Sequence, residues 1–265
     1  LTSLAMGYHM RNGVVFMYDW REQQQLAWQL AWRVPELERG TAVFAVEKPS
    51  RYMNDYLLAM QLNMMYGSRA RGNGEVEYWV FVLTWRDREG HVRNVQLGRD
   101  VRELHGQVSL DRVYRNIRFS GNTAKSLSYW YSRGRCLRVI DAERGNIEDL
   151  PRVAIAAGAI SNVDLIRGNS LDMRWMTQVY GAEPEQSWCY YYQKAELARQ
   201  RKEWNEVARL GDEARRLGHT TTYPAEWGPF LDAYERVGRV EDAQKVRKSA
   251  CKGMVHERPR FCGNA

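Results

Sequence analysis

The chain has 265 residues, of which 44% are hydrophobic and 12% aromatic, so it can form one large or two ordinary folded domains. This composition excludes an intrinsically disordered chain. The formal net charge is +7, but only seven of the 39 basic residues are lysines, and acidic residues are interspersed among them. An arginine-rich surface of mixed sign favours protein contacts, and no nucleic-acid-binding fingerprint is present. We therefore expect protein partners and no nucleic acid.

Residues 1–7 form an apolar stub ahead of the first predicted helix. The sequence has no run of eighteen apolar residues, and so no complete transmembrane helix. The stub is interpreted either as the outer end of a membrane helix or signal segment, left behind by cleavage, or as an ordinary flexible terminus. Under the first interpretation Leu1, Leu4 and Met6 are candidates for a tether that lodges in the next subunit of an assembly.

Residues 1–145 are predicted to form a mixed α/β domain with a mainly antiparallel sheet. Aromatic residues and alanines at helical spacing predict a helix at 14–34, which Pro35 ends. A strand at 41–47 leads into a helix at 50–66, for which Ser50 is the expected cap. Runs of β-branched and aromatic residues predict further strands at 75–85, 91–97, 115–119, 126–131 and 136–140.

A helical connector is predicted at 146–187, with its helix at 147–166 and a linker at 167–172. Residues 188–252 then contain two copies of one helical hairpin, which align with an offset of 36 residues. Aromatic residues at the start of the first helix and small residues where the helices cross are typical of tetratricopeptide repeats. The predicted packing residues are Trp188, Tyr191, Ala198, Trp204 and Ala214 in the first copy and Trp227, Tyr234, Gly238, Ala243 and Ala250 in the second.

The two copies differ at the turn between their helices. Gly238 suits the tight turn of the second copy, whereas Lys202 occupies the matching position of the first. About three such repeats are usually needed to bury a continuous core, so two copies must pack against another part of the chain. The pair is therefore interpreted either as a helical closure of the domain or as a groove that binds a peptide.

Four cysteines are present, an even number, with no Cys-x-x-Cys spacing and no accompanying histidine cluster. This pattern argues against zinc and permits two disulfides in an oxidising compartment. We predict the pairs Cys136–Cys189 and Cys251–Cys262, the second of which would staple a tail at 253–265 that shows no periodicity.

The sequence shows no catalytic signature, phosphate-binding loop or dinucleotide fingerprint, and its histidines have no metal-ligand spacing. Asp55 opens a helix after a strand, where sugar-transfer enzymes often keep an acidic residue. A lone Asp at this position is more often a helix-start charge on the favourable end of the helix dipole. We therefore predict no catalytic, cofactor-binding or metal-binding residues, and no cofactor.

Four stretches carry a resemblance that spans nearly the whole chain: DW at 19–20 with WRVP at 32–35, RNIRFSGNT at 115–123, CLRVID at 136–141, and WCYYYQKAELA at 188–198. Together they resemble the extracytoplasmic C-terminal region of a family of multi-spanning bacterial membrane proteins of unknown function. The membrane part of that family is similar to that of lipid-linked-sugar glycosyltransferases. The resemblance implies an outward-facing domain and supplies no catalytic residues.

These observations together predict an α+β protein outside the cytoplasmic membrane, extracellular or at the cell surface. The expected function is that of a non-enzymatic cell-envelope protein, released from a membrane-anchored precursor, that acts through protein–protein contacts. Copies of itself in a surface filament or layer are among the expected partners. The alternative is the extracytoplasmic domain of a glycosyltransferase-like membrane enzyme that helps to bind the acceptor or the sugar. No small-molecule substrate is identified.

Overall fold

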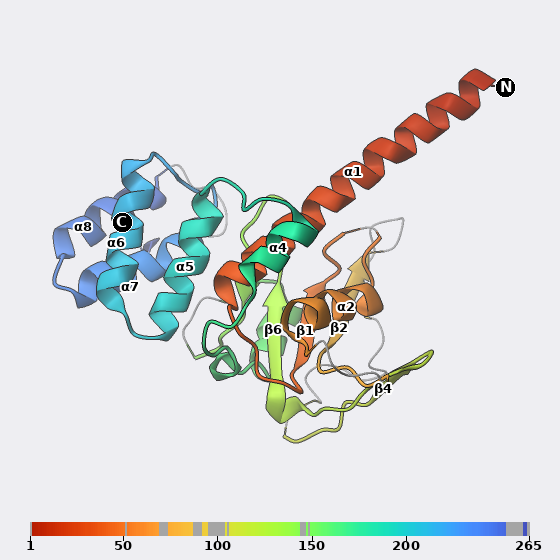
Figure 1. Ribbon diagram of the computed structural model, residues 1–265. Coiled ribbons are helices and arrows are strands. Elements are labelled where there is room, and N and C mark those ends of the chain that lie inside the picture. Colours follow the sequence, from red (N-terminus) through yellow and green to blue (C-terminus); the bar gives the residue numbers. More distant parts are fainter. Residues whose placement is uncertain are drawn as a thin grey trace.

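The computed structural model describes residues 2–50, 52–68, 74–86, 92–94, 104, 106–143, 147, 149–252 and 262–263. The α+β class is confirmed: a mixed α/β part precedes a helical part (Figure 1). The first part contains α1 (Thr2–Arg33), β1 (Ala42–Glu47), α2 (Asp55–Tyr66), β2 (Trp79–Arg86), β3 (Val92–Asn94), β4 (Arg112–Tyr114), β5 (Ile117–Phe119), η2 (Thr123–Lys125), β6 (Ser126–Trp130) and β7 (Arg138–Val139). The second contains α3 (Arg152–Gly158), η3 (Val163–Leu165), α4 (Met173–Tyr180), α5 (Trp188–Gln200), α6 (Trp204–Arg216), η4 (Pro224–Trp227), α7 (Gly228–Arg236) and α8 (Val240–Ala250).

The main sheet has the strand order β3-β2-β1-β6-β7 and a parallel centre. β1 is parallel to both β2 and β6, and only the outer pairs are antiparallel. The prediction of a mainly antiparallel sheet is therefore wrong. The helix α2 carries the chain back across the sheet between β1 and β2, which gives parallel neighbours. The central strand is covered on both faces, and Phe44, Ala45 and Val46 are fully buried, as is typical of parallel strands.

Two predicted element boundaries are corrected by local hydrogen bonding. The helix α2 begins at Asp55 and not at Ser50, because the side chain of Asn54 accepts a hydrogen bond of 2.9 Å from the backbone N–H of Leu57. The strand expected at 115–119 begins at Ile117. Arg115 has φ 54° and forms the turn between β4 and β5, a hairpin that was not predicted.

The connector differs most from its prediction. The continuous helix expected at 147–166 is wrong: the structure has only the short helix α3, which follows Pro151, and the single turn η3. The helix α4, which was not predicted, starts where Asp172 accepts hydrogen bonds from the backbone N–H groups of Arg174 and Trp175 at 3.0 and 3.1 Å. These short elements pack on the sheet and on α1, so tertiary contacts and not local periodicity determine them.

The buried side chains form two hydrophobic cores. The larger surrounds the sheet and includes Leu26, Trp28 and Trp32 of α1. The smaller lies within the four helices α5–α8. The C-terminal half of α1 packs against α5 and so joins the two parts, whereas its N-terminal half projects away from the body (Figure 1).

The helix α1 begins at Thr2, so the described residues of the N-terminal stub are helical. The predicted start at residue 14 is corrected accordingly. Leu1 and nearly all of the predicted tail at 253–265 lie outside the described residues; of the tail, Cys262 and Gly263 are described.

Candidate functional surfaces

The two hairpins of the helical part repeat each other with the predicted offset. The first helix of each hairpin ends at Gln200 or Arg236, and the second begins at Trp204 or Val240, so both boundaries are 36 residues apart. The offset was predicted from side-chain patterns alone, and the helix boundaries of α5–α8 follow it.

The turns inside the hairpins also repeat. In the first hairpin the backbone N–H of Glu203 donates to the carbonyl of Ala198 at 2.9 Å. At the equivalent positions of the second hairpin, 36 residues later, the backbone N–H of Arg239 donates to the carbonyl of Tyr234 at 2.7 Å. Lys202 has φ 61° and Gly238 has φ 78°, so both residues occupy the left-handed region. The lysine therefore adopts a conformation that glycine adopts without strain.

The predicted packing residues meet in the smaller core. Trp188 and Trp227 have ring centroids 4.4 Å apart. Trp204 and Ala250 are partly buried against this core, and Gly238 is exposed at its turn. The remaining predicted packing residues are buried: Tyr191, Ala198, Ala214, Tyr234 and Ala243.

The two ends of the helical array have different surroundings. The outer side of α5 packs against α1. On α8 only Ala243 and Val246 are buried, and apart from Val240 at its start its exposed side is polar, with Glu241, Lys245 and Lys248. Terminal helices with a polar outer face end repeat arrays. Head-to-tail stacking through these two ends is therefore not favoured.

A hollow of about 1000 Å³ opens beside the turns of both hairpins. The guanidinium of Arg236 lies over the ring of Trp204, 4.4 Å from its centroid. Arg209 pairs with Glu206 and Glu213 at 2.7 Å, which orders one wall of the hollow. The lining combines one aromatic ring with charges of both signs, a composition that suits a polypeptide partner. The lining residues are Lys202, Glu203, Trp204, Asn205, Glu206, Arg209, Arg236 and Val237.

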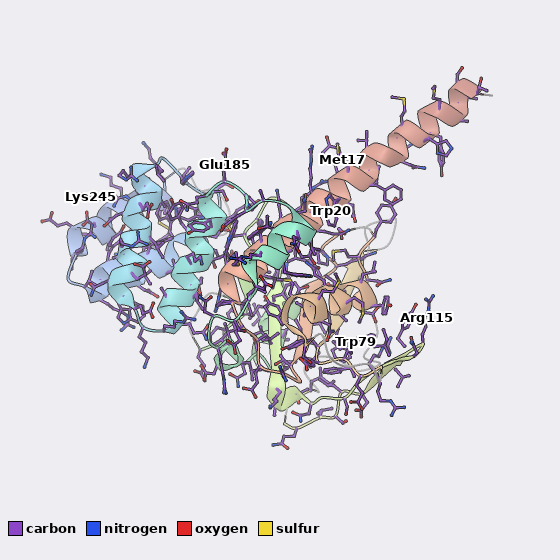
Figure 2. The ribbon with its side chains drawn as sticks, viewed as in Figure 1. Met17, Trp20, Trp79, Arg115, Glu185 and Lys245 are labelled. Atoms are coloured by element: carbon purple, nitrogen blue, oxygen red, sulfur yellow. A yellow bond between two sulfur atoms is a disulfide. The ribbon has the colours of Figure 1, made fainter. Side chains whose placement is uncertain are left out.

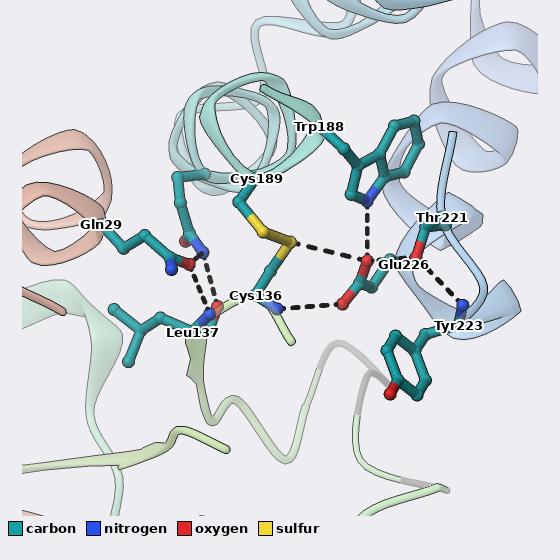
Figure 3. Close-up of a disulfide and its surroundings, with 9 residues drawn as sticks. Gln29, Cys136, Leu137, Trp188, Cys189, Thr221, Tyr223 and Glu226 are labelled. Atoms are coloured by element: carbon teal, nitrogen blue, oxygen red, sulfur yellow. Dashed lines mark hydrogen bonds between the residues drawn. A yellow bond between two sulfur atoms is a disulfide. The ribbon is translucent and has the colours of Figure 1, made fainter. Parts of the chain in front are cut away.

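The joint between the two parts is covalent. Cys136, beside β7, is bonded to Cys189 at the start of α5 (Figure 3). Next to this disulfide, the buried carboxylate of Glu226 accepts hydrogen bonds from Trp188 Nε1 at 2.6 Å and Thr221 Oγ1 at 2.7 Å. It also accepts the backbone N–H of Cys136 at 3.3 Å. Burial raises the pKa of Glu226.

Two buried amides complete the joint (Figure 3). Gln29 of α1 accepts the backbone N–H of Leu137 at 2.6 Å, and Gln193 of α5 donates to the carbonyl of Leu137 at 2.6 Å and to Gln29 at 3.2 Å. Further along α1, Arg33 donates to Gln200 at 2.9 Å, and burial lowers the pKa of Arg33 to about 10. Three separate segments are thus held together by buried polar groups with partners, which fixes one arrangement of the two parts.

Both predicted disulfides are present, since Cys251 is bonded to Cys262 and the described residues contain no free cysteine. Two disulfides fit an oxidising, extracellular environment.

The sequence could not reveal the Glu226 site, because Glu226 lies in the short segment PAEW, whose pattern predicts only a helix start.

A third surface lies where α1 leaves the body, beside the carboxyl ends of the parallel strands. Phe16 stacks on Tyr52, which follows β1, with ring centroids 4.7 Å apart. Glu22 accepts hydrogen bonds from Tyr131 Oη at 3.1 Å and Arg133 Nε at 2.8 Å, both of which follow β6. Ligands of α/β sheets bind at this edge of the parallel strands.

Asp55 sits in the first turn of α2, is buried, and has Arg112 Nη2 3.5 Å from its carboxylate. This pairing supports its interpretation as a helix-start charge.

A cavity of about 650 Å³ lies at the opposite, amino edge of the parallel strands. Lys125 donates a hydrogen bond to Glu38 there and holds the pKa of this carboxyl below its usual range, while Arg167 pairs with the same carboxylate at 2.8 Å. The charge of Glu38 is thus neutralised by neighbouring side chains.

The candidate tether residues lie on the projecting half of α1. Leu4 and Met6 are 79% and 69% exposed and contact no hydrophobic core of the described chain, and Leu1 is outside the described residues. Figure 2 shows Met17 and Trp20 on the same projecting helix.

Among the described residues no group of three or more His, Cys, Asp or Glu side chains is arranged to hold a metal ion. In the described part of the chain, the helices are too short or too polar to cross a membrane. No family model, curated protein or solved structure matches the chain.

Proposed function

We propose that this chain is a non-enzymatic, extracellular cell-envelope protein that acts through protein–protein contacts, and that its two hairpins form the contact surface in the manner of tetratricopeptide repeats. The observation that carries the proposal is the 36-residue repeat of helix ends and turn hydrogen bonds in α5–α8, with a hollow open beside both turns. The two disulfides support the extracellular location.

The surroundings of the two ends of the array favour a contact at its sides. Because α1 covers α5 and the outer face of α8 is polar, a partner gains most by entering the hollow beside Trp204 and Arg236. Tryptophan and arginine are the residues most enriched among those that dominate binding energy at interfaces. A copy of the same chain is the first partner to test.

The experiment is sedimentation of the oxidised chain over a range of concentrations, followed by chemical cross-linking and mass spectrometry. Trp204→Ala with Arg236→Ala is expected to abolish association and cross-links through the hollow. The control is Leu217→Ala with Arg216→Ala, two exposed residues at the far end of α6, which should leave association unchanged. A chain that stays monomeric at every concentration contradicts self-association, and association that survives the first pair contradicts the hollow as the contact surface.

A second candidate is favoured by the edge of the sheet at which α1 departs. There Tyr131 and Arg133 donate hydrogen bonds to Glu22, and Tyr52 stacks on Phe16, at the carboxyl ends of the parallel strands. Aromatic rings beside carboxylates and arginine suit a carbohydrate. The chain would then be the extracytoplasmic domain of a glycosyltransferase-like membrane enzyme and would help to bind the acceptor or the sugar. Saturation-transfer NMR with oligosaccharides tests it, with Tyr52→Ala as the variant that should lose the signal.

A further inference from the structure

The helix α1 has two halves with opposite surroundings. Residues 26–33 are all buried in the body, whereas residues 2–18 are exposed or only partly covered. The exposed half carries large apolar side chains and a single charged residue, Arg11. Exposed apolar surface of this extent on one element marks a contact with another molecule or with a membrane.

The distribution of these side chains identifies what covers them. Leu4, Met6, Tyr8 and Met10 follow one another at every second position, and each is at least 64% exposed. Successive residues of an α-helix are rotated by about 100°, so every second residue lies on nearly the opposite side. The apolar side chains therefore surround the helix, and the polar residues between them, Thr2, Ser3, His9, Arg11 and Asn12, do not gather into one polar face.

A helix that packs against one partner helix needs a single apolar stripe, and its other side stays polar. A helix that is apolar all round is buried on every side, as in a lipid bilayer. The seventeen residues at 2–18 extend for about 25 Å, which is comparable with the thickness of a hydrocarbon core, about 30 Å. The lone arginine, Arg11, lies seven residues, about 10 Å, from Tyr18, and its charge opposes insertion.

Aromatic residues surround the helix where it meets the body. Tyr18 and Trp20 are 48% and 43% exposed, and Tyr52 is 37% exposed and stacks on Phe16. The guanidinium groups of Arg21 and Arg133 lie 5.9 and 5.7 Å from the centroid of the Tyr18 ring. Tyrosine and tryptophan gather at the level of lipid headgroups, where arginine also meets phosphate.

We propose that residues 2–18 of α1 insert into a lipid bilayer, with Tyr18, Trp20 and Tyr52 at the level of the headgroups. The inserted half enters the bilayer and does not cross it within the described residues. This placement turns the carboxyl ends of the parallel strands, where α1 leaves the body, toward the membrane surface. It does not depend on the contact surface proposed for the hairpins.

The test is flotation of the full oxidised chain with vesicles of phosphatidylcholine, alone or mixed with phosphatidylglycerol. The unaltered chain should float with both, and high salt should leave flotation with phosphatidylcholine unchanged, because apolar burial drives insertion. Replacing Leu4, Met6 and Met10 together by Asp should lower partitioning by at least about a hundredfold, since each buried apolar side chain contributes several-fold or more. The uncharged triple Gln variant, which favours helix, should also lose binding.

The matched control replaces three exposed apolar residues of the body by Asp: Val113, Leu217 and Val240, which are 63%, 45% and 52% exposed. It makes the same change in net charge and should float as the unaltered chain does. An equal loss in this control would overturn the proposal, as would an unaltered chain that remains unbound. The proposal would also be overturned if the unaltered chain formed a dimer, did not bind vesicles, and dissociated when the α1 residues were substituted. The exposed half of α1 would then be a contact with a second copy of the chain.

The depth of insertion has its own readout. Lipids brominated near the headgroup should quench part of the tryptophan fluorescence, and Trp20→Phe should remove the quenched part. Circular dichroism of each variant should show an intact body. Quenching that is unchanged by Trp20→Phe would contradict the placement of the aromatic residues at the headgroups.

Discussion

Replacing Lys202 by glycine should stabilise the protein. Lys202 has φ 61°, in the region where an L side chain crowds its own backbone, at a cost of about 1–2 kcal/mol. Glycine removes that cost but adds about 0.5–1 kcal/mol of conformational entropy to the unfolded chain. The difference predicts a net gain of about 0.5–1 kcal/mol for Lys202→Gly. For a chain of this size the gain corresponds to a rise in Tm of about 1–2 °C.

The structure supplies the inverse change in the second hairpin. Gly238 has φ 78°, and a Cβ built on it meets no atom within 4 Å. Gly238→Ala therefore adds backbone strain and no steric clash, and should destabilise the protein by about 1 kcal/mol. The two substitutions together test whether Lys202 and Gly238 are equivalent positions of one repeated turn.

Urea unfolding measures both effects, as shifts of the midpoint at constant slope. Lys202→Ala separates the backbone from the side chain, because it removes the amine and keeps an L residue in the same conformation. The reasoning is refuted if Lys202→Ala stabilises the protein as much as Lys202→Gly does, since the effect would then come from the lysine side chain.

Two further predictions concern the joint between the parts. Burial raises the pKa of Glu226 in the folded state above its ordinary value of 4.5. The wild-type chain therefore loses stability as the pH rises from 4.5 through this raised pKa. The glutamine of Glu226→Gln does not titrate, so the stability of this variant relative to wild type should increase with pH in that window. The measurement is chemical unfolding at several pH values. A difference in unfolding free energy that stays constant with pH would contradict the prediction. Replacing Cys136 and Cys189 by Ser should cost about 4 kcal/mol by loop entropy, because the bond spans 53 residues, whereas removing the Cys251–Cys262 bond, which spans 11, should cost about 3 kcal/mol. Thermal unfolding without reductant that gives the opposite order would contradict the assignment of the first bond as the main clamp.

The sequence predicts well those elements whose signals are local. The aromatic runs around Phe44, Phe81 and Tyr129 predict strands, and the structure places all three in the sheet. The hairpin boundaries also follow from local patterns, because each turn is set by residues close in the chain, down to the strained Lys202. Both disulfide pairs were predicted, the second from short spacing.

The features that escaped prediction depend on contacts between distant segments. The parallel pairing of β1 with β6 joins Val43 to Leu127, and strand propensity carries no information about direction. The acceptor role of Glu226 depends on donors from Cys136 and Trp188, far away in the chain. The start of α1 was predicted too late because its first residues have no polar face, so the periodicity that signals an amphipathic helix is missing there.

The disulfide at the joint also determines how the molecule responds to mechanical load. Tension applied between the end of α1 and the end of α8 runs along the backbone to Cys136, crosses the sulfur atoms, and continues from Cys189. The segment between them, which includes β7, α3 and α4, lies on a slack branch and carries no force. Stretching an oxidised molecule therefore cannot extend that segment, whereas reduction adds it to the extensible length. A protein exposed to shear at a cell surface would keep its connector folded for as long as this one covalent bond lasts.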